Sequence, residues 1–200
     1  HYEKWPSHFQ DASHLKISQY DGFHPSRILY AGLGGSAAPG DILKNRLEPV
    51  LKIPFIVLKD YDLPEFVGKN DFVLGVSCSG DTEEVLKMMK DALKKGCKIA
   101  GISSGGRLEK FCKKNTISYI KIKNLGVSRA SFPYLFYPAG NILKELCFLG
   151  EIEKQLDSSK QAVKELQQDI AVDTPIEKNP SKKLATKIFN GFPLIYVSAK

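Results

Sequence analysis

The stretch that most constrains the fold runs from Arg27 to Ser36 and reads R-I-L-Y-A-G-L-G-G-S. An apolar run that suits a buried strand leads directly into a glycine-rich segment that ends in Ser36. Glycines let the backbone turn tightly and approach a ligand closely. A helix that begins there offers unpaired N–H groups and the positive end of its dipole. We therefore expect a buried strand, an anion-binding loop and a helix, with Ser36 at the helix start.

Short apolar runs then alternate with segments of helical periodicity. Strands are expected over 27–33, 53–58, 71–76, 97–102 and 116–122, and helices over 36–47, 82–95, 107–114 and 133–149. Strands that are apolar throughout suit a sheet that helices cover on both faces. The pattern predicts an α/β fold with a doubly wound, parallel, five-stranded sheet, preceded by an amphipathic helix within residues 3–17.

The last quarter of the chain follows a different pattern. It predicts, in order, a helix over 151–171, a linker with two prolines over 173–180, a helix start over 181–189 and an apolar strand over 193–197. A new α/β unit thus begins and is not completed. We expect residues 1–150 to form an N-terminal domain and residues 151–200 to connect it to the start of a second one.

Composition narrows the class of partner. The 200 residues carry a net charge of +7. The cations are spread over helix-like stretches, without the interleaved aromatic residues that hold single-stranded nucleic acid. We therefore expect attraction for small anions and no nucleic-acid partner. No apolar run reaches the roughly 18 residues of a membrane span, so no membrane partner is expected.

The four cysteines are far apart and form no C-x-x-C pair; they are Cys78, Cys97, Cys112 and Cys147. This spacing does not suit a zinc site. A disulfide framework is also not expected in a chain long enough to bury a sizeable core. We predict reduced thiols, a cytoplasmic protein, and neither a metal ion nor a cofactor.

Three expected loops lie where ligands bind in an open parallel sheet, beyond the carboxyl ends of its strands. They cover 32–36, 77–82 and 103–106 and are rich in Gly, Ser and Thr. Hydroxyls and backbone N–H groups at helix starts are good phosphate partners. Ser77, Ser79 and Thr82 fit this role, and Thr82 is also expected to cap the following helix.

A dinucleotide site is the competing hypothesis. Gly32, Gly34 and Ala37 match the fingerprint G-x-G-x-x-[GA], and Asp60 follows the next strand at about the distance needed to hold a ribose. A nicotinamide enzyme, however, has no obvious need for the second hydroxyl-rich loop over 77–82.

Five segments in this order resemble the sugar isomerase (SIS) domain and, within it, the bifunctional phosphoglucose/phosphomannose isomerase family. They are Gly32–Ala37, Lys59–Tyr61, Val76–Glu84, Ile102–Leu108 and Ser128–Ala130. The resemblance covers about residues 27–149. It implies flavodoxin-like topology, two SIS domains in a chain, a homodimer, and a small-molecule sugar phosphate bound between the domains.

The resemblance also implies roles for individual residues. One backbone group and four hydroxyls would bind the substrate phosphate: Gly35, Ser36, Ser77, Ser79 and Thr82. Arg129 matches the family arginine that steadies the enediolate intermediate, and would be catalytic. A fixed guanidinium that faces developing oxyanion charge is a strong electrostatic stabiliser.

Some positions depart from the family pattern. Cys78 and Asp81 stand where Tyr and Asn are common in the family. Asp81 adds a negative charge beside the proposed phosphate, which weakens binding unless the carboxylate turns outward. The family's glutamate base and its ring-opening His and Lys lie in the second domain, beyond Lys200.

The function implied is aldose–ketose isomerisation of glucose 6-phosphate or mannose 6-phosphate and fructose 6-phosphate through an enediolate. This chain would supply the phosphate-binding half and would not turn over alone, because the reaction needs a base. Two alternatives remain: a non-catalytic, regulatory SIS module that binds a sugar phosphate, and a nicotinamide-dependent oxidoreductase domain.

Overall fold

The centre of the fold is a parallel sheet of five strands. A computed structural model describes residues 2–16, 22–147 and 150–196 of the chain. The strands are β1 (Ile28–Ala31), β2 (Phe55–Leu58), β3 (Phe72–Ser77), β4 (Lys98–Ser103) and β5 (Ser118–Lys121). Their order is β2-β1-β3-β4-β5, and all neighbours are parallel. The winding direction reverses between β1 and β3, which is where ligands bind in this topology.

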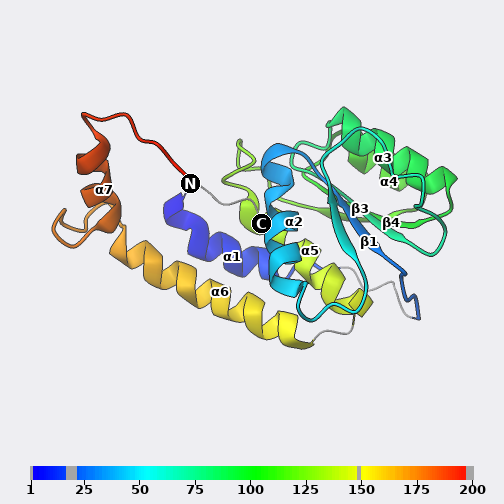
Figure 1. The fold of residues 1–200 in the computed structure, drawn as a ribbon, viewed down its shortest axis with the longest axis horizontal. Helices are drawn as coiled ribbons and strands as arrows, with labels where there is room; N and C mark the ends of the chain where they lie inside the picture. The colour runs from blue at the N-terminus through cyan, green and yellow to red at the C-terminus, as the bar shows by residue number, and fades with distance from the viewer. Residues whose placement is uncertain (1, 17–21, 148–149, 197–200) are drawn as a thin grey trace.

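Helices cover both faces of the sheet (Figure 1). The helical elements are η1 (Tyr2–Lys4), α1 (Trp5–Ser13), η2 (Gly34–Ser36), α2 (Ala38–Leu47), α3 (Glu83–Lys94), α4 (Gly106–Lys114), α5 (Phe132–Cys147), α6 (Gly150–Asp169) and α7 (Pro180–Ile188). Helices α3 and α4 pack on one face, and α2 and α5 on the other, with α1 against α5. The doubly wound α/β fold is confirmed.

Strand β1 shows why its sequence is apolar throughout. Its side chains alternate between the two faces. Ile28 and Tyr30 belong to the core beneath α1, α2 and α5, whereas Leu29 and Ala31 belong to the core beneath α3 and α4. All of these side chains are fully buried. Burial in two cores explains why every residue of β1 is apolar, and the glycine-rich loop follows at its carboxyl end.

The segment after α7 differs from the prediction. Residues 192–196 form no strand, and the last residue of the expected strand lies outside the described part of the chain. A strand needs a neighbour to accept and donate its backbone hydrogen bonds, and none of the described strands pairs with this segment. The predicted strand at this position is therefore wrong for the structure described here.

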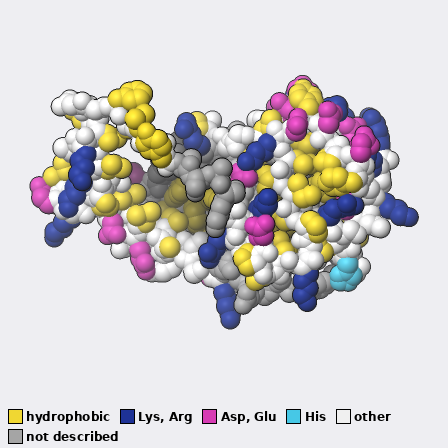
Figure 2. All heavy atoms as spheres, in the orientation of Figure 1, with side chains coloured by type: hydrophobic (Ala, Val, Ile, Leu, Met, Phe, Trp, Pro, Cys, Tyr) yellow, Lys and Arg dark blue, Asp and Glu magenta, His cyan; other side chains and the backbone are white. Residues whose placement is uncertain are grey.

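Apolar side chains on this segment face outward. Phe189, Phe192, Ile195 and Tyr196 are each more than four-fifths exposed, at 84%, 88%, 85% and 88%. They belong to the end of α7 and the segment that follows it, and Figure 2 shows hydrophobic side chains on the surface of this part of the molecule. Such side chains are normally covered by another part of a protein.

Two further observations bear on the class of protein. Within the described residues, we find no helix with the length and apolar content that crossing a membrane requires. All four cysteines are free, and three of them are buried.

Candidate functional site

The loops after β1 and β3 meet at the carboxyl edge of the sheet, on either side of the point where the winding reverses. The Cys78 backbone N–H donates to Ser36 Oγ over 3.1 Å. Strand β1 also holds Ser36, because the buried hydroxyl of Tyr30 donates to the Ser36 carbonyl oxygen at 2.8 Å. The glycine-rich segment that ends in Ser36 and the hydroxyl-rich segment over 77–82 are thus directly joined.

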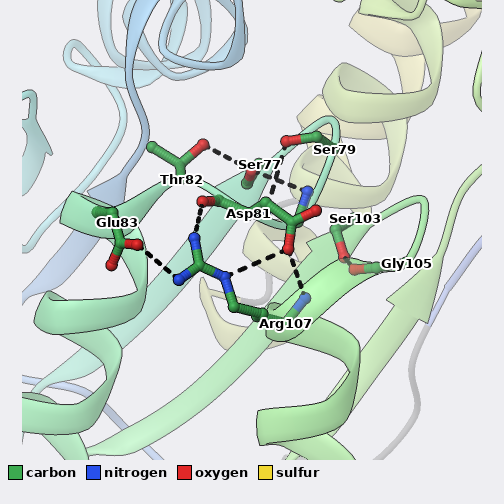
Figure 3. A network of polar contacts seen from close by, with 9 residues as sticks. Ser77, Ser79, Asp81, Thr82, Glu83, Ser103, Gly105 and Arg107 are labelled. Carbon is green, nitrogen blue, oxygen red and sulfur yellow. Dashed lines mark hydrogen bonds and ion pairs between the residues drawn. The ribbon is translucent and has the colours of Figure 1, made fainter.

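The loop over 77–82 is held by its own hydroxyls (Figure 3). Ser77 Oγ accepts from the Gly80 N–H at 3.0 Å, and Ser79 Oγ accepts from the Asp81 N–H at 3.2 Å. Gly80 has φ of +81°, and a Cβ on it would lie 1.9 Å from the Gly105 carbonyl oxygen. Only glycine fits here, because the neighbouring loop presses directly on this turn.

Thr82 lies where it was expected but does not act as expected. It occupies the N-cap position of α3, yet its side chain accepts no hydrogen bond from the helix. Its hydroxyl instead pairs with Ser77 Oγ at 2.8 Å. The predicted side-chain cap is therefore wrong. Because no described side chain caps α3, the N–H groups of its first turn are left for another acceptor, such as an anion.

A third loop brings Arg129 to the same edge. Gly35 approaches this loop so closely that a Cβ on it would lie 2.6 Å from Ser128 Oγ and 3.8 Å from the Arg129 backbone nitrogen. The Arg129 side chain is exposed and forms no ion pair with any other described residue. The loop that packs against the glycine-rich turn thus carries a guanidinium that no described carboxylate pairs with.

The Asp81 carboxylate turns to the next loop rather than to these hydroxyls (Figure 3). Asp81 Oδ1 accepts from the Arg107 backbone N–H at 2.9 Å and lies 3.4 Å from Arg107 Nε. Arg107 also donates to Glu83 Oε1 at 2.5 Å. The hydrogen bond with Glu83 is the main cause that raises the pKa of Arg107. The hydrogen bond with Asp81 also raises the pKa of Arg107.

Arg107 is the functional candidate that sequence reasoning missed. It lies within one of the five recognised segments, yet none of the expected roles involved it. The available signal was Asp81 in the loop and Glu83 at the start of α3, followed by a cation at the start of α4.

The loop over 103–106 supports its neighbours. Ser103 Oγ donates to the Gly105 carbonyl oxygen at 2.8 Å, and Ser104 Oγ donates to the Cys78 carbonyl oxygen at 2.7 Å. The Tyr119 hydroxyl donates to the Ser103 carbonyl oxygen, and burial raises the pKa of Tyr119 to about 12. The serine hydroxyls of this loop donate to protein carbonyls, so their hydrogens are used within the fold.

Comparison with known proteins places the chain in a family, although no protein-family model matches it. It is 35% identical over 170 residues to the bifunctional phosphoglucose/phosphomannose isomerase of Caldicellulosiruptor bescii, which covers 85% of this chain and 50% of that protein. It is 28% identical over 198 residues to the D-glucosamine-6-phosphate 4-epimerase of Sulfolobus acidocaldarius, over 98% of this chain and 59% of that enzyme.

A solved structure shows the same fold. The C-terminal domain of glucosamine-fructose-6-phosphate aminotransferase from Francisella tularensis superposes with a TM-score of 0.61 at 17% identity, over 94% of this chain and 57% of that one. The chain spans about half the length of the isomerase relative it matches. The resemblance seen in the motifs is confirmed, and the chain belongs to the SIS family of phosphosugar isomerases.

Proposed function

We propose that this chain supplies the phosphate-binding half of an isomerase that interconverts glucose 6-phosphate or mannose 6-phosphate with fructose 6-phosphate. The observation that carries the proposal is the hydrogen bond between Ser36 Oγ and the Cys78 N–H, which joins the glycine-rich loop after β1 to the hydroxyl-rich loop after β3 at the reversal point of the sheet. The relationship to a bifunctional phosphoglucose/phosphomannose isomerase supports this substrate class.

The hydrogen bonds of the hydroxyls suit a phosphate. Ser36 Oγ and Ser79 Oγ each accept a backbone N–H, so each hydroxyl hydrogen is available to donate. Ser77 and Thr82 share one hydrogen between their oxygens, which leaves the other free. A phosphate dianion offers acceptors for all of these donors, and the open start of α3 adds N–H groups and a favourable dipole.

Arg129 is the proposed stabiliser of the enediolate. Isomerisation moves a proton between C1 and C2, and negative charge develops on the oxygens of these carbons. A guanidinium that pairs with no carboxylate among the described residues is available to that oxyanion, and electrostatic stabilisation of this kind is often the largest single contribution to a rate.

The base that moves the proton is proposed to lie in a second SIS domain. We assign residues 1–150 to the first domain, and residues 151–200 to a connection and the start of the second. The exposed apolar side chains of Phe189, Phe192 and Tyr196 support this division, because a further domain would cover them. The sugar would then lie between two domains of a homodimeric, cytoplasmic enzyme.

The test is titration of this 200-residue chain with fructose 6-phosphate, together with an assay of its conversion to glucose 6-phosphate and mannose 6-phosphate. We expect binding without turnover, and turnover by a longer chain that includes a second domain. Isomerisation by the 200-residue chain would contradict a missing base. Protection against heat by NAD, and not by sugar phosphates, would favour the dinucleotide hypothesis instead.

A further inference from the structure

We infer that Asp81 and Arg107 are positioning residues for the phosphate site: they fasten the Ser77–Thr82 loop to the start of α4 and hold the Asp81 carboxylate away from the bound anion. This inference rests on the proposed phosphate-binding function. Neither residue is expected to touch the substrate, since both act through the loop that carries the hydroxyls.

The backbone of α4 supplies the first part of the attachment. Gly105, at the N-cap of α4, has no side chain that caps the helix. The Arg107 N–H donates to Asp81 Oδ1 at 2.9 Å, and the Leu108 N–H donates to the Gly80 carbonyl oxygen at 2.8 Å. The loop after β3 therefore caps a helix that follows a different strand, and a carboxylate in this position also stabilises the helix dipole.

The Arg107 side chain supplies the second part. One of its terminal nitrogens donates to the Asp81 carbonyl oxygen at 2.5 Å, and the other donates to Glu83 Oε1 at 2.5 Å. A planar guanidinium with several fixed donors can make these contacts together, which the single ammonium of lysine cannot reproduce. Figure 3 shows the guanidinium between the loop and the first residue of α3.

One hydrogen bond connects Asp81 to Ser79, which is a proposed phosphate ligand. The Asp81 N–H donates to Ser79 Oγ at 3.2 Å, so the position of the Asp81 backbone sets the position of that hydroxyl. A loop already held in its binding conformation loses less conformational entropy when the ligand binds. If Arg107 were absent, the Asp81 and Glu83 carboxylates would lack their counter-charge beside a site for a dianion.

The effect should appear in binding more than in stability. The side chains of Arg107 and Asp81 are about half exposed, at 49% and 54%. Exposed ion pairs contribute little to folding because water screens them and ordering the side chains costs entropy. A variant that loses this pair should therefore fold, while its loop is less well placed for phosphate.

The experiment is calorimetric titration with fructose 6-phosphate at low ionic strength, with the thermal unfolding midpoint recorded for each variant. Arg107→Ala and Arg107→Gln should each weaken binding about fivefold. Asp81→Asn keeps the acceptor for the Arg107 N–H and should bind at least as tightly as the wild type. The double variant Arg107→Ala/Asp81→Asn should recover only part of that loss, because one of the two uncompensated carboxylates is gone while the guanidinium contacts to the Asp81 carbonyl oxygen and to Glu83 are still missing.

A matched control removes the same charge from the other end of the same helix. Lys114 lies exposed in the last turn of α4, and Lys114→Ala should bind fructose 6-phosphate as the wild type does. If Arg107→Ala and Arg107→Gln bind normally, or if the double variant binds as tightly as the wild type so that charge alone explains the loss, the positioning role is overturned. If the wild-type chain itself does not bind fructose 6-phosphate, the proposed function fails and this inference fails with it.

Discussion

Helices α3 and α4 begin at the same edge of the sheet, after neighbouring strands, in loops of similar composition, and yet their starts are built differently. At α4, the Asp81 carboxylate and the Gly80 carbonyl accept the N–H groups of Arg107 and Leu108. At α3, no described side chain caps the helix, since the Thr82 hydroxyl turns to Ser77. The start of α4 is thus capped by the neighbouring loop, whereas no described side chain caps the start of α3, where we propose that the phosphate binds.

The hydroxyls of the two loops differ in the same sense. Ser103 and Ser104 donate their hydrogens to protein carbonyls, which leaves nothing to offer a ligand. Ser79 accepts a backbone N–H, as does Ser36 in the loop after β1, and each keeps its hydrogen. A glycine- and serine-rich loop is therefore not a ligand site by composition alone. We propose that the direction of its internal hydrogen bonds decides whether it can bind a phosphate.

The largest expected effect comes from a substitution that separates the loop over 77–82 from the loop over 103–106. Gly80→Ala places a Cβ 1.9 Å from the Gly105 carbonyl oxygen, at a residue whose φ is +81°. A backbone atom cannot move aside as a flexible side chain can, so we expect the free energy of unfolding to fall by about 3 kcal/mol. Urea denaturation measures this loss, and phosphate binding should fall with it.

The control for this variant is Gly68→Ala. A Cβ on Gly68 meets no atom within 4 Å, and its φ is not in the left-handed region. Its free energy of unfolding should stay within about 0.5 kcal/mol of the wild type. Equal stability of the Gly80 and Gly68 variants would show that the two loops are not tightly docked in solution.

The second prediction makes the start of α3 resemble that of α4. Thr82→Asp supplies a carboxylate at the N-cap, which should stabilise the helix by about 0.5–1 kcal/mol. The same carboxylate occupies the donors proposed for the phosphate and repels it. We therefore expect fructose 6-phosphate affinity to fall at least about tenfold while stability rises.

Thr82→Ser is the matched variant for that substitution, because it keeps a hydroxyl for Ser77 and adds no charge. It should bind fructose 6-phosphate within about threefold of the wild type. Calorimetric titration and thermal unfolding measure the two effects separately. Undiminished binding by Thr82→Asp would mean that α3 does not receive the phosphate.

The sequence predicted the sheet, the edge and the loops because these follow from local patterns. An apolar run that ends in glycines specifies a buried strand and a turn within about ten residues, as at Ile28–Gly35. The contact between Asp81 and Arg107 joins residues 26 positions apart in sequence. It depends on how two loops pack, and the residue pattern alone does not fix that packing.

Two local rules also failed for physical reasons. Thr82 follows the N-cap preference in sequence, but the Ser77 hydroxyl competes for its side chain and forms the hydrogen bond. Residues 193–197 have the composition of a strand, but no described strand pairs with residues 193–196. In both cases the outcome is decided by a neighbour in space.

The third prediction tests whether the free hydroxyl hydrogen in the loop after β3 matters. Ser79→Ala removes the donor and leaves the Asp81 N–H without its acceptor. Loss of one hydrogen bond to a charged group costs about 1.5 kcal/mol, so fructose 6-phosphate should bind roughly tenfold more weakly. Binding that is unchanged in Ser79→Ala would remove this residue from the proposed phosphate ligands.

The smallest effect on binding is expected in the loop over 103–106, which precedes α4. Ser104→Ala removes a hydroxyl that donates to the Cys78 carbonyl oxygen, but the Ser104 backbone N–H still donates to that oxygen at 3.1 Å. We expect unfolding to become easier by about 1 kcal/mol, with affinity for fructose 6-phosphate within about twofold of the wild type. Urea denaturation measures the free energy of unfolding, and calorimetric titration of the same sample measures the affinity for fructose 6-phosphate. If Ser104→Ala weakened binding as much as Ser79→Ala, the two loops would contribute alike, and hydrogen-bond direction would not distinguish a ligand loop from a supporting one.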